Sequence, residues 1–238
     1  AAALTNTAAV FTFISNEDST ATINVTGGAG NDSITAGVEK SNFTGGGGND
    51  TFIFTTAGLT SLDTIAGGDG VDVLHITAAS TIVDSDFDNV TSVATIVQGT
   101  ANAAQTITLG SAADAAGIAT ITGNGSGVET VTVGAGFDND LTIALGGAKA
   151  ENDDIDASAS SATITLTAAL TAITAQDTLM GGTGTGDTIT LTAATQQTAV
   201  FGASFTGFET IGVTAATTNH LTVTMGNSLS SGDVVTLD

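Results

Sequence analysis

The chain lacks five residue types altogether, because its 238 residues contain no cysteine, proline, tryptophan, tyrosine or arginine. Without cysteine it has neither disulfides nor a thiol nucleophile. Basic residues are almost missing too, with 2 lysine plus arginine against 24 aspartate plus glutamate, which gives a net charge of −22. This balance argues against binding to nucleic acid or to an anionic membrane, because nothing would replace the phosphate counterions.

Long apolar runs are missing as well. No segment approaches the roughly 18 consecutive apolar residues that a membrane helix needs, and the alanine-rich start lacks the basic region of a signal peptide. We therefore expect no membrane insertion, and no export signal is readable.

The residues that are present favour ordered β-structure. Glycine occurs 31 times, 41% of the residues are hydrophobic, and the mean hydropathy is +0.34. Disordered chains combine high charge with low hydrophobicity, whereas threonine, valine and isoleucine favour strands. Self-repulsion at a net charge of −22 opposes compaction, so bound cations are the simplest remedy.

The clearest motif is a nine-residue repeat of the form Gly-Gly-x-Gly-x-Asp-x-apolar-x. Three copies match it in full, at residues 27–35, 45–53 and 67–75. The first two begin 18 residues apart, at 27 and 45, so one degenerate copy (36–44) lies between them. Two nonapeptides per coil would stack the full copies on one side of a solenoid.

Weaker copies flank and follow these three. The nine residues before the third full copy keep Asp63 in the matching place. Residues 124–132 carry Glu129 where the motif has aspartate, and residues 181–189 restate the motif with one inserted residue and with Asp187. The pattern therefore decays beyond residue 80 without disappearing.

Between the glycine-rich segments, threonine alternates with aliphatic residues, as in 106–109, 163–167 and 221–224. A period of two predicts strands with aliphatic side chains inside and threonines outside. Short strands joined by glycine-rich corners are typical of a solenoid, in which each coil buries its apolar row against its neighbours. Residues 112–117 favour a single helical turn.

The repeat also predicts a metal site. Glycine allows backbone with positive φ, so carbonyl groups can turn toward a common centre. Calcium accepts carboxylate and carbonyl oxygens, and Asp32 and Asp50, one coil apart, would face one ion. At about 5 Å and an effective dielectric near 20, two carboxylates repel by roughly 3 kcal/mol. The alternative is that these Gly-Asn-Asp segments form turns without metal.

The nonapeptide resembles the repeat of the repeats-in-toxin (RTX) family. That resemblance implies an all-β, right-handed parallel β-roll or β-helix whose turns bind calcium (Ca²⁺). Residues 1–80 would form the β-roll, and residues 81–238 a degenerate threonine-rich solenoid continuing from it. It implies these calcium ligands: Asp32, Asp50, Asp72, Asp63 and Asp187, with carbonyls of Gly28, Gly30, Gly46, Gly48, Gly68 and Gly70.

Other motifs carry little chemistry. The segment 84–89 begins like an EF-hand loop, but Asn89 replaces the turn glycine and Thr95 the closing glutamate. The segment 202–206 does not match a nucleophile elbow, because Thr206 stands in place of its last glycine. We expect no enzymatic activity.

We therefore expect a calcium-dependent structural protein of the bacterial cell surface that self-assembles as a surface layer or an extracellular fibre. Its partner would be the protein itself, with a cell-surface polysaccharide as a second candidate. An extracellular location follows because millimolar calcium fills weak sites there. The alternatives are an RTX adhesin, an ice-binding module, or the carboxyl-terminal module of a type I-secreted enzyme. The Thr-x-Thr pairs begin at 106, 120, 130, 163, 188 and 222, an uneven spacing that argues against an ice-binding lattice.

Overall fold

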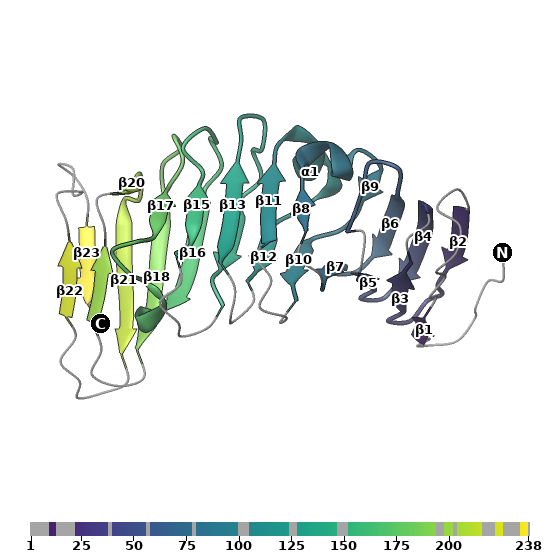
Figure 1. The fold of residues 1–238 in the computed structure, drawn as a ribbon, viewed down its shortest axis with the longest axis horizontal. Helices are drawn as coiled ribbons and strands as arrows, with labels where there is room; N and C mark the ends of the chain where they lie inside the picture. Colours follow the sequence, from purple (N-terminus) through teal and green to yellow (C-terminus); the bar gives the residue numbers. More distant parts are fainter. Residues whose placement is uncertain are drawn as a thin grey trace.

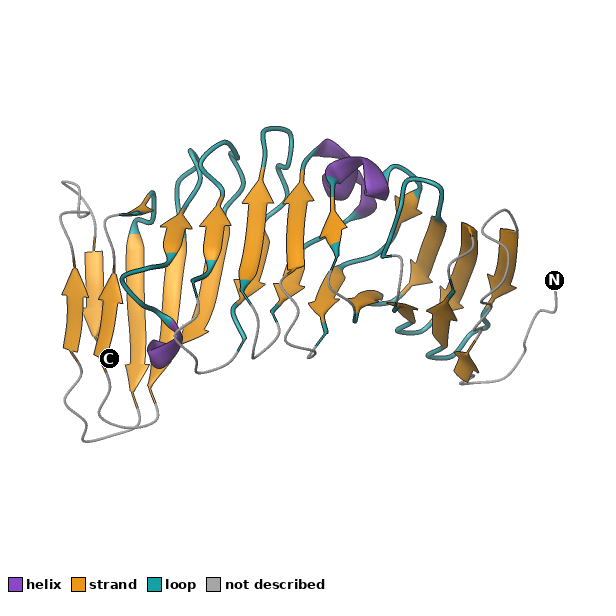
Figure 2. Cartoon of the chain, in the orientation of Figure 1, coloured by secondary structure: helices purple, strands orange, loops and turns teal. Residues whose placement is uncertain are grey.

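The chain folds as a right-handed parallel β-solenoid, which confirms the predicted fold class. Its coils stack along the long axis of the molecule from the N-terminal to the C-terminal end (Figure 1). Strands make up nearly all of the regular structure (Figure 2). The computed structural model describes residues 10–12, 22–37, 40–55, 58–77, 80–99, 105–123, 128–146, 152–193, 198–201, 204–215, 222–225 and 234–237.

One sheet of 11 parallel strands runs the length of the solenoid. In order across the sheet, its strands are β1 (Val10–Thr12), β3 (Ser33–Ala36), β5 (Thr51–Phe54), β7 (Val73–Ile76), β10 (Thr95–Gln98), β12 (Thr120–Thr122), β14 (Leu141–Ala144), β16 (Ile164–Ala169), β18 (Thr188–Ala193), β21 (Thr210–Ala215) and β23 (Val234–Leu237). We call it the long sheet.

Three shorter sheets complete the coils. The four-stranded sheet contains β2 (Thr22–Thr26), β4 (Lys40–Gly47), β6 (Thr64–Asp69) and β9 (Val90–Thr91). The six-stranded sheet contains β8 (Thr81–Ile82), β11 (Gln105–Leu109), β13 (Glu129–Val133), β15 (Asp154–Asp156), β17 (Thr178–Met180) and β20 (Phe205–Thr206). The remaining pair is β19 (Thr198–Phe201) with β22 (Thr222–Met225).

The coils change from two sides to three at β7. Before that point, strands of the long sheet alternate with strands of the four-stranded sheet. The coil that begins with β7 contains β8, the 3₁₀ helix η1 (Asp84–Phe87) and β9. In the next coil, helix α1 (Ser111–Ala116) stacks beside β9, and the predicted helical turn is therefore present. A second 3₁₀ helix, η2 (Leu170–Ala172), follows β16.

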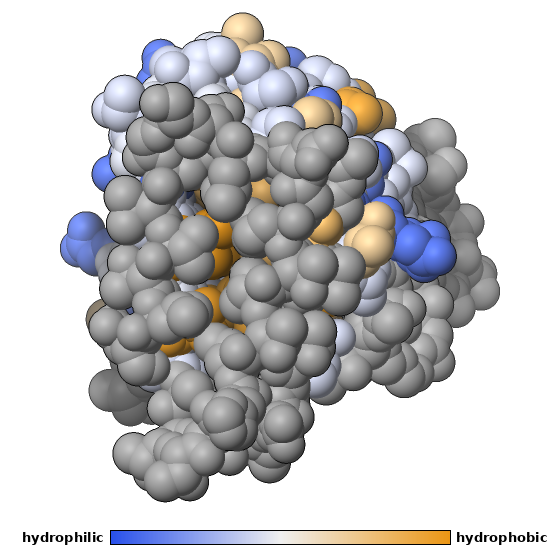
Figure 3. All heavy atoms as spheres, turned by 90° about the vertical axis from the view of Figure 1, so that its left-hand side faces the viewer, coloured by the Kyte–Doolittle hydropathy of each residue, from blue (hydrophilic) through white to orange (hydrophobic). Residues whose placement is uncertain are grey.

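The core is a column of apolar side chains at equivalent positions of successive coils. Parallel pairing places one inward residue of each long-sheet strand directly beside the next. Each is at most 2% exposed: Ile34, Phe52, Leu74, Ile96, Ile121, Ile143, Leu166, Ile189 and Ile211. Seen from the C-terminal end, hydrophobic residues are visible inside the rim of the molecule (Figure 3).

The outward positions of the long sheet carry threonine in register. Six successive strands, from β10 to β21, place a threonine in one column: Thr95, Thr120, Thr142, Thr165, Thr188 and Thr210. The uneven sequence spacing of the Thr-x-Thr pairs was therefore a wrong argument against a regular array. The pairs at 106 and 130 lie in the six-stranded sheet, and the corners absorb the differences in coil length.

Candidate metal-binding corner

The three aspartates of the full repeats lie one above another where the chain enters the long sheet. Asp32, Asp50 and Asp72 each precede a strand, β3, β5 and β7 respectively. The backbone N–H of Asp32 donates to Oδ1 of Asp50 at 2.8 Å, and the N–H of Asp50 donates to Oδ1 of Asp72 at 2.7 Å. We call this set the aspartate column. Successive aspartates of the column are 18 and 22 positions apart in the sequence, and the first of these spacings confirms the 18-residue coil expected between the first two copies.

The aspartate column is buried and lacks part of its hydrogen bonding. Asp50 and Asp72 are 0% exposed, and their Oδ2 atoms have no hydrogen-bond partner among the described residues. Burial raises the pKa of Asp50 to about 6; the hydrogen bond from Asp32 N–H lowers it, and the charges of Asp72 and Asp32 raise it again. Burial likewise raises the pKa of Asp72. Ionised carboxylates here need a compensating positive charge.

The first glycine of each repeat makes room for its aspartate. A Cβ added to Gly45 would overlap Oδ2 of Asp50 and would lie 2.6 Å from the carbonyl oxygen of Gly67 in the next coil. In the second and third copies, the glycines at motif positions 2 and 4 have positive φ, for example 118° at Gly46 and 104° at Gly48, conformations that side chains rarely allow. The Gly-Gly-x-Gly pattern therefore combines close packing of its first glycine against the carboxylate with positive-φ backbone at the other two.

The donor set in this corner fits a hard cation. In the described part of the chain, the Oδ2 atoms of Asp50 and Asp72 have no hydrogen-bond partner. The carbonyl oxygens of Gly28 and Gly46 lie close to the equivalent glycine one coil on. That of Gly28 also accepts the N–H of Gly47 at 2.8 Å, which leaves it one lone pair for an ion. Calcium prefers such carboxylate and carbonyl ligands. Among the described residues, no three acidic, histidine or cysteine side chains form a metal-binding group. An ion in this corner would therefore rely on one or two carboxylates and on backbone oxygens.

Asp187 occupies the same corner in a later coil. It precedes β18 of the long sheet, and its Oδ1 accepts the N–H of Ile164 at 2.7 Å, one coil back. The N–H of Asp187 in turn donates to Oε2 of Glu209 at 2.7 Å. The structure thus places Asp187 in line with the aspartate column. Four coils lie between them, and the residue directly before the outward column of the long sheet is uncharged in each: Ala94, Ala119, Leu141 and Ile164.

Asp63 lies elsewhere. It precedes β6 of the four-stranded sheet, and its Oδ1 accepts the N–H of Ser41 at 2.7 Å. Its Oδ2 accepts the N–H and the hydroxyl of Thr60, both at 2.9 Å. Both oxygens of Asp63 are therefore engaged by protein donors, and the structure does not bring this side chain together with the aspartate column.

A second buried carboxylate column, which the glycine repeat does not predict, enters the six-stranded sheet. Asp153 Oδ1 accepts the N–H of Glu129 at 3.0 Å, and Asp177 Oδ1 accepts the N–H of Asp153 at 3.1 Å. All three side chains are at most 3% exposed, and burial raises the pKa of Asp153 and Asp177. The sequence signal is an acidic residue at the start of each strand: Glu129 lies in a weak copy of the glycine repeat, whereas Asp153 and Asp177 lie outside it.

The acidic loop that resembled an EF-hand serves another purpose. The carboxylate of Asp84 accepts the N–H groups of Gly110, Ala112 and Ala113 at 2.7 to 3.2 Å. These groups begin α1 in the next coil and have no partner within the helix. Asp84 therefore caps the N-terminus of helix α1, which lies in the next coil.

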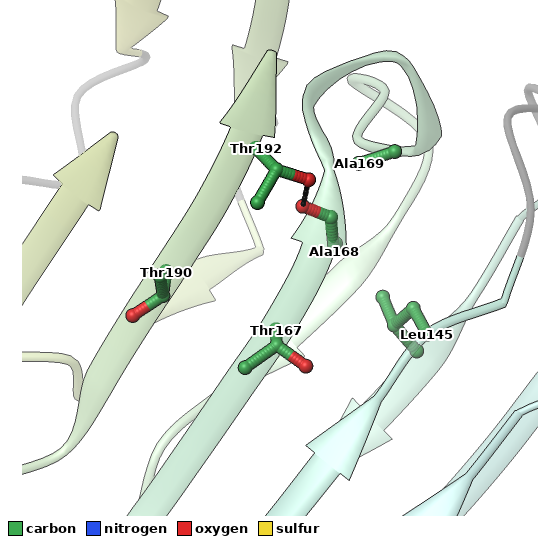
Figure 4. Close-up of a pocket in the computed structure, with 6 residues that line it drawn as sticks. All are labelled: Leu145, Thr167, Ala168, Ala169, Thr190 and Thr192. Atoms are coloured by element: carbon green, nitrogen blue, oxygen red, sulfur yellow. Dashed lines mark hydrogen bonds between the residues drawn. The ribbon is translucent and has the colours of Figure 1, made fainter. Parts of the chain in front are cut away.

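The long sheet also bears a hollow of about 300 Å³ beside β16 and β18 (Figure 4). Its lining consists of Leu145, Thr167, Ala168, Ala169, Thr190 and Thr192. The Thr192 hydroxyl donates to the carbonyl oxygen of Ala168 at 3.4 Å. These side chains supply hydroxyl and methyl groups only, so the hollow offers no general base for catalysis.

Comparison with protein-family models, with curated proteins and with solved structures finds no match for this chain.

The raised pKa values predict an unusual pH dependence for the metal-free protein. The folded-state pKa of Asp50 is about 6 against an ordinary value of 3.8, so the folded chain binds more protons than the unfolded chain between these values. The free energy of unfolding should therefore fall as the pH rises from about 4 to about 6, and level off above. Circular dichroism in chelator, recorded from pH 4.5 to 7.5, measures how much of the N-terminal β-structure remains and would test this.

Asp50→Asn is the control for that profile, because lower net charge at acid pH also reduces general repulsion. Asparagine cannot titrate, so the variant should show a flatter profile. A wild-type profile that rises with pH would contradict the assignment.

Proposed function

We propose that this chain is a calcium-dependent structural protein of the bacterial cell surface, which self-assembles as a surface layer or an extracellular fibre. We further propose that it is an RTX-type protein, exported by type I secretion, and that it has no enzymatic activity. Calcium would be held by the turns at Asp32, Asp50 and Asp72. The Asp187 corner is a weaker candidate, because Oδ1 and Oδ2 of Asp187 already accept the N–H groups of Ile164 and Gly182.

The observation that carries the proposal is the unpaired Oδ2 of Asp50 and of Asp72 inside the glycine corner. A buried ionised carboxylate without a partner is costly, and two stacked ones also repel. Bound calcium supplies the missing charge and accepts the carboxylate and carbonyl oxygens that the corner presents. Extracellular calcium is concentrated enough to fill such sites, which supports a location outside the cell.

The shape of the molecule supports a structural role over a catalytic one. The solenoid presents long, repetitive faces, and repeat proteins of this kind use such surfaces for extended contacts. Within the described residues, no helix is long and apolar enough to cross a membrane. The register of the threonine column favours a second candidate, an ice-binding or adhesin module, because a regular hydroxyl array suits a repetitive ligand.

Asp50→Asn tests the calcium proposal through two effects of opposite sign. Without calcium, asparagine still accepts the N–H of Asp32 through its amide oxygen and removes a buried charge, so the variant should be more stable than the wild type. With calcium, it should lose at least about tenfold in affinity, or about 1.4 kcal/mol. Circular dichroism in chelator, which measures the β-structure that each protein retains, and titration calorimetry measure the two effects.

Asp138→Asn is the matched control, since Asp138 is exposed and its Oδ1 accepts the hydroxyl of Ser161 at 2.7 Å. It should change neither quantity by much. Equal calcium affinities for Asp50→Asn and the wild type would remove the aspartate column from the calcium site.

A further inference from the structure

The outer face of the long sheet carries no carboxylate, lysine or arginine over nine successive coils. Its two outward columns from β3 to β21 consist of Ser33, Thr51, Val73, Thr95, Thr120, Thr142, Thr165, Thr188 and Thr210, and of Thr35, Ile53, His75, Val97, Thr122, Ala144, Thr167, Thr190 and Gly212. We call this surface the threonine face. His75 is its one titratable side chain, and burial lowers the pKa of that residue.

The neutrality of the threonine face contrasts with the rest of the molecule. The chain has 24 acidic residues and a net charge of −22, and the other sheets carry charge at outward positions, including Asp154 and Asp156 on β15 and Lys40 on β4. Two copies of so acidic a protein repel through most of their surface. The threonine face is where they can approach with the least repulsion.

The chemistry and size of the threonine face suit a second copy. Threonine methyl groups and the apolar side chains of Ile53, Val73 and Val97 offer apolar area, and a column of identical residues is self-complementary across a two-fold axis. Nine strands about 4.8 Å apart, with four residues of about 3.3 Å each, cover roughly 570 Å². The total of about 1,100 Å² from two copies is at the lower limit of specific interfaces.

We propose that the threonine face is the surface through which two copies of this chain pair, sheet against sheet. This inference rests on the proposed self-assembly and names the surface that serves it. Pairing leaves the acidic sides exposed on the outside of the dimer, where calcium and further copies reach them.

The test places one charge on β12, the middle strand of the 11. In a two-fold dimer, Thr120→Asp brings two like charges close together, and Thr142→Asp on β14 repeats the experiment one coil away. Thr106→Asp is the matched control, because Thr106 is an outward, half-buried threonine on β11 of the six-stranded sheet and adds the same net charge. All proteins are calcium-loaded, with folding checked by circular dichroism and calcium binding by calorimetry.

Sedimentation equilibrium then measures the monomer–dimer dissociation constant at 0.05 and 0.5 M NaCl. We expect Thr120→Asp and Thr142→Asp to raise it at least tenfold and Thr106→Asp to change it less than twofold. Salt should strengthen the wild-type dimer, because it screens the repulsion between the acidic sides.

Three results would overturn the inference while calcium binding stands. The first is a wild type that stays monomeric at all concentrations, and the second is a dimer with equal dissociation constants in all variants. The third is a monomer whose thermal hysteresis, or whose binding to a neutral polysaccharide, is abolished by Thr120→Asp alone. Absence of any calcium response in the wild type would instead count against the proposed function.

Discussion

Removal of calcium is expected to unfold the N-terminal coils of the purified protein. Chelation should abolish the β-type circular dichroism of at least the first 80 residues, because the aspartate column then holds buried, mutually repelling carboxylates at neutral pH. One site occupied at 100 times its dissociation constant contributes about 2.7 kcal/mol, and further sites add to this. The loss of three such sites is comparable with the whole stability of an ordinary domain.

Hydrogen exchange measured by mass spectrometry localises this effect in the intact chain. Amides of β3, β5 and β7 should lose protection on chelation before those of β13 and β15, which follow the second carboxylate column. Magnesium at the same concentration is the control, since it demands a tighter octahedral site and should restore less. An unchanged spectrum after verified metal removal would overturn the calcium requirement.

Gly45→Ala should be among the most damaging single methyl additions in the chain. The added Cβ overlaps Oδ2 of Asp50 and lies 2.6 Å from the carbonyl oxygen of Gly67, so either the carboxylate or the neighbouring coil must move. Overpacking of this kind costs about 1–3 kcal/mol, and displacement of Asp50 should weaken calcium binding in addition. Urea unfolding with and without calcium measures both parts.

Gly47→Ala is the control within the same turn. Its added Cβ would have 3.8 Å to its nearest neighbour, the Cα of Ala29, so we expect near-normal stability and calcium affinity. If the two alanine variants unfold at the same urea concentration, the close packing of Gly45 around the Asp50 carboxylate does not matter for stability.

The sequence predicts the solenoid well because its signals are local and repeated. Alternation of threonine with aliphatic residues specifies inward and outward faces, and the 18-residue spacing of the first two repeats gives the length of their coil. The aspartates at the same motif position, Asp32, Asp50 and Asp72, duly stack in one column. Alternation, repeat spacing and motif position can all be read without knowing which parts of the chain contact one another.

The parts that the sequence did not predict depend on which corner a residue enters. Glu129 and Glu209 both lie in a Gly-x-Glu-Thr-aliphatic segment. Yet Glu129 begins a strand of the six-stranded sheet, whereas Glu209 precedes a strand of the long sheet. Asp63 lies in the copy directly before a full repeat, so a coil of two nonapeptides already places it on the side opposite the aspartate column. The later coils are harder to predict because their corners take up extra residues that carry no periodic signal.

The ladder between coils fixes the advance along the axis at about 4.8 Å per coil, whatever the number of residues in that coil. Coils of 18 and 22 residues stack with the same strand register. A corner can therefore gain or lose residues without changing the pitch, whereas adding or deleting a whole coil changes the length of the rod by a fixed step. Insertions at the corners would change the loops that a given coil exposes, and duplication of whole coils would change the length of the solenoid.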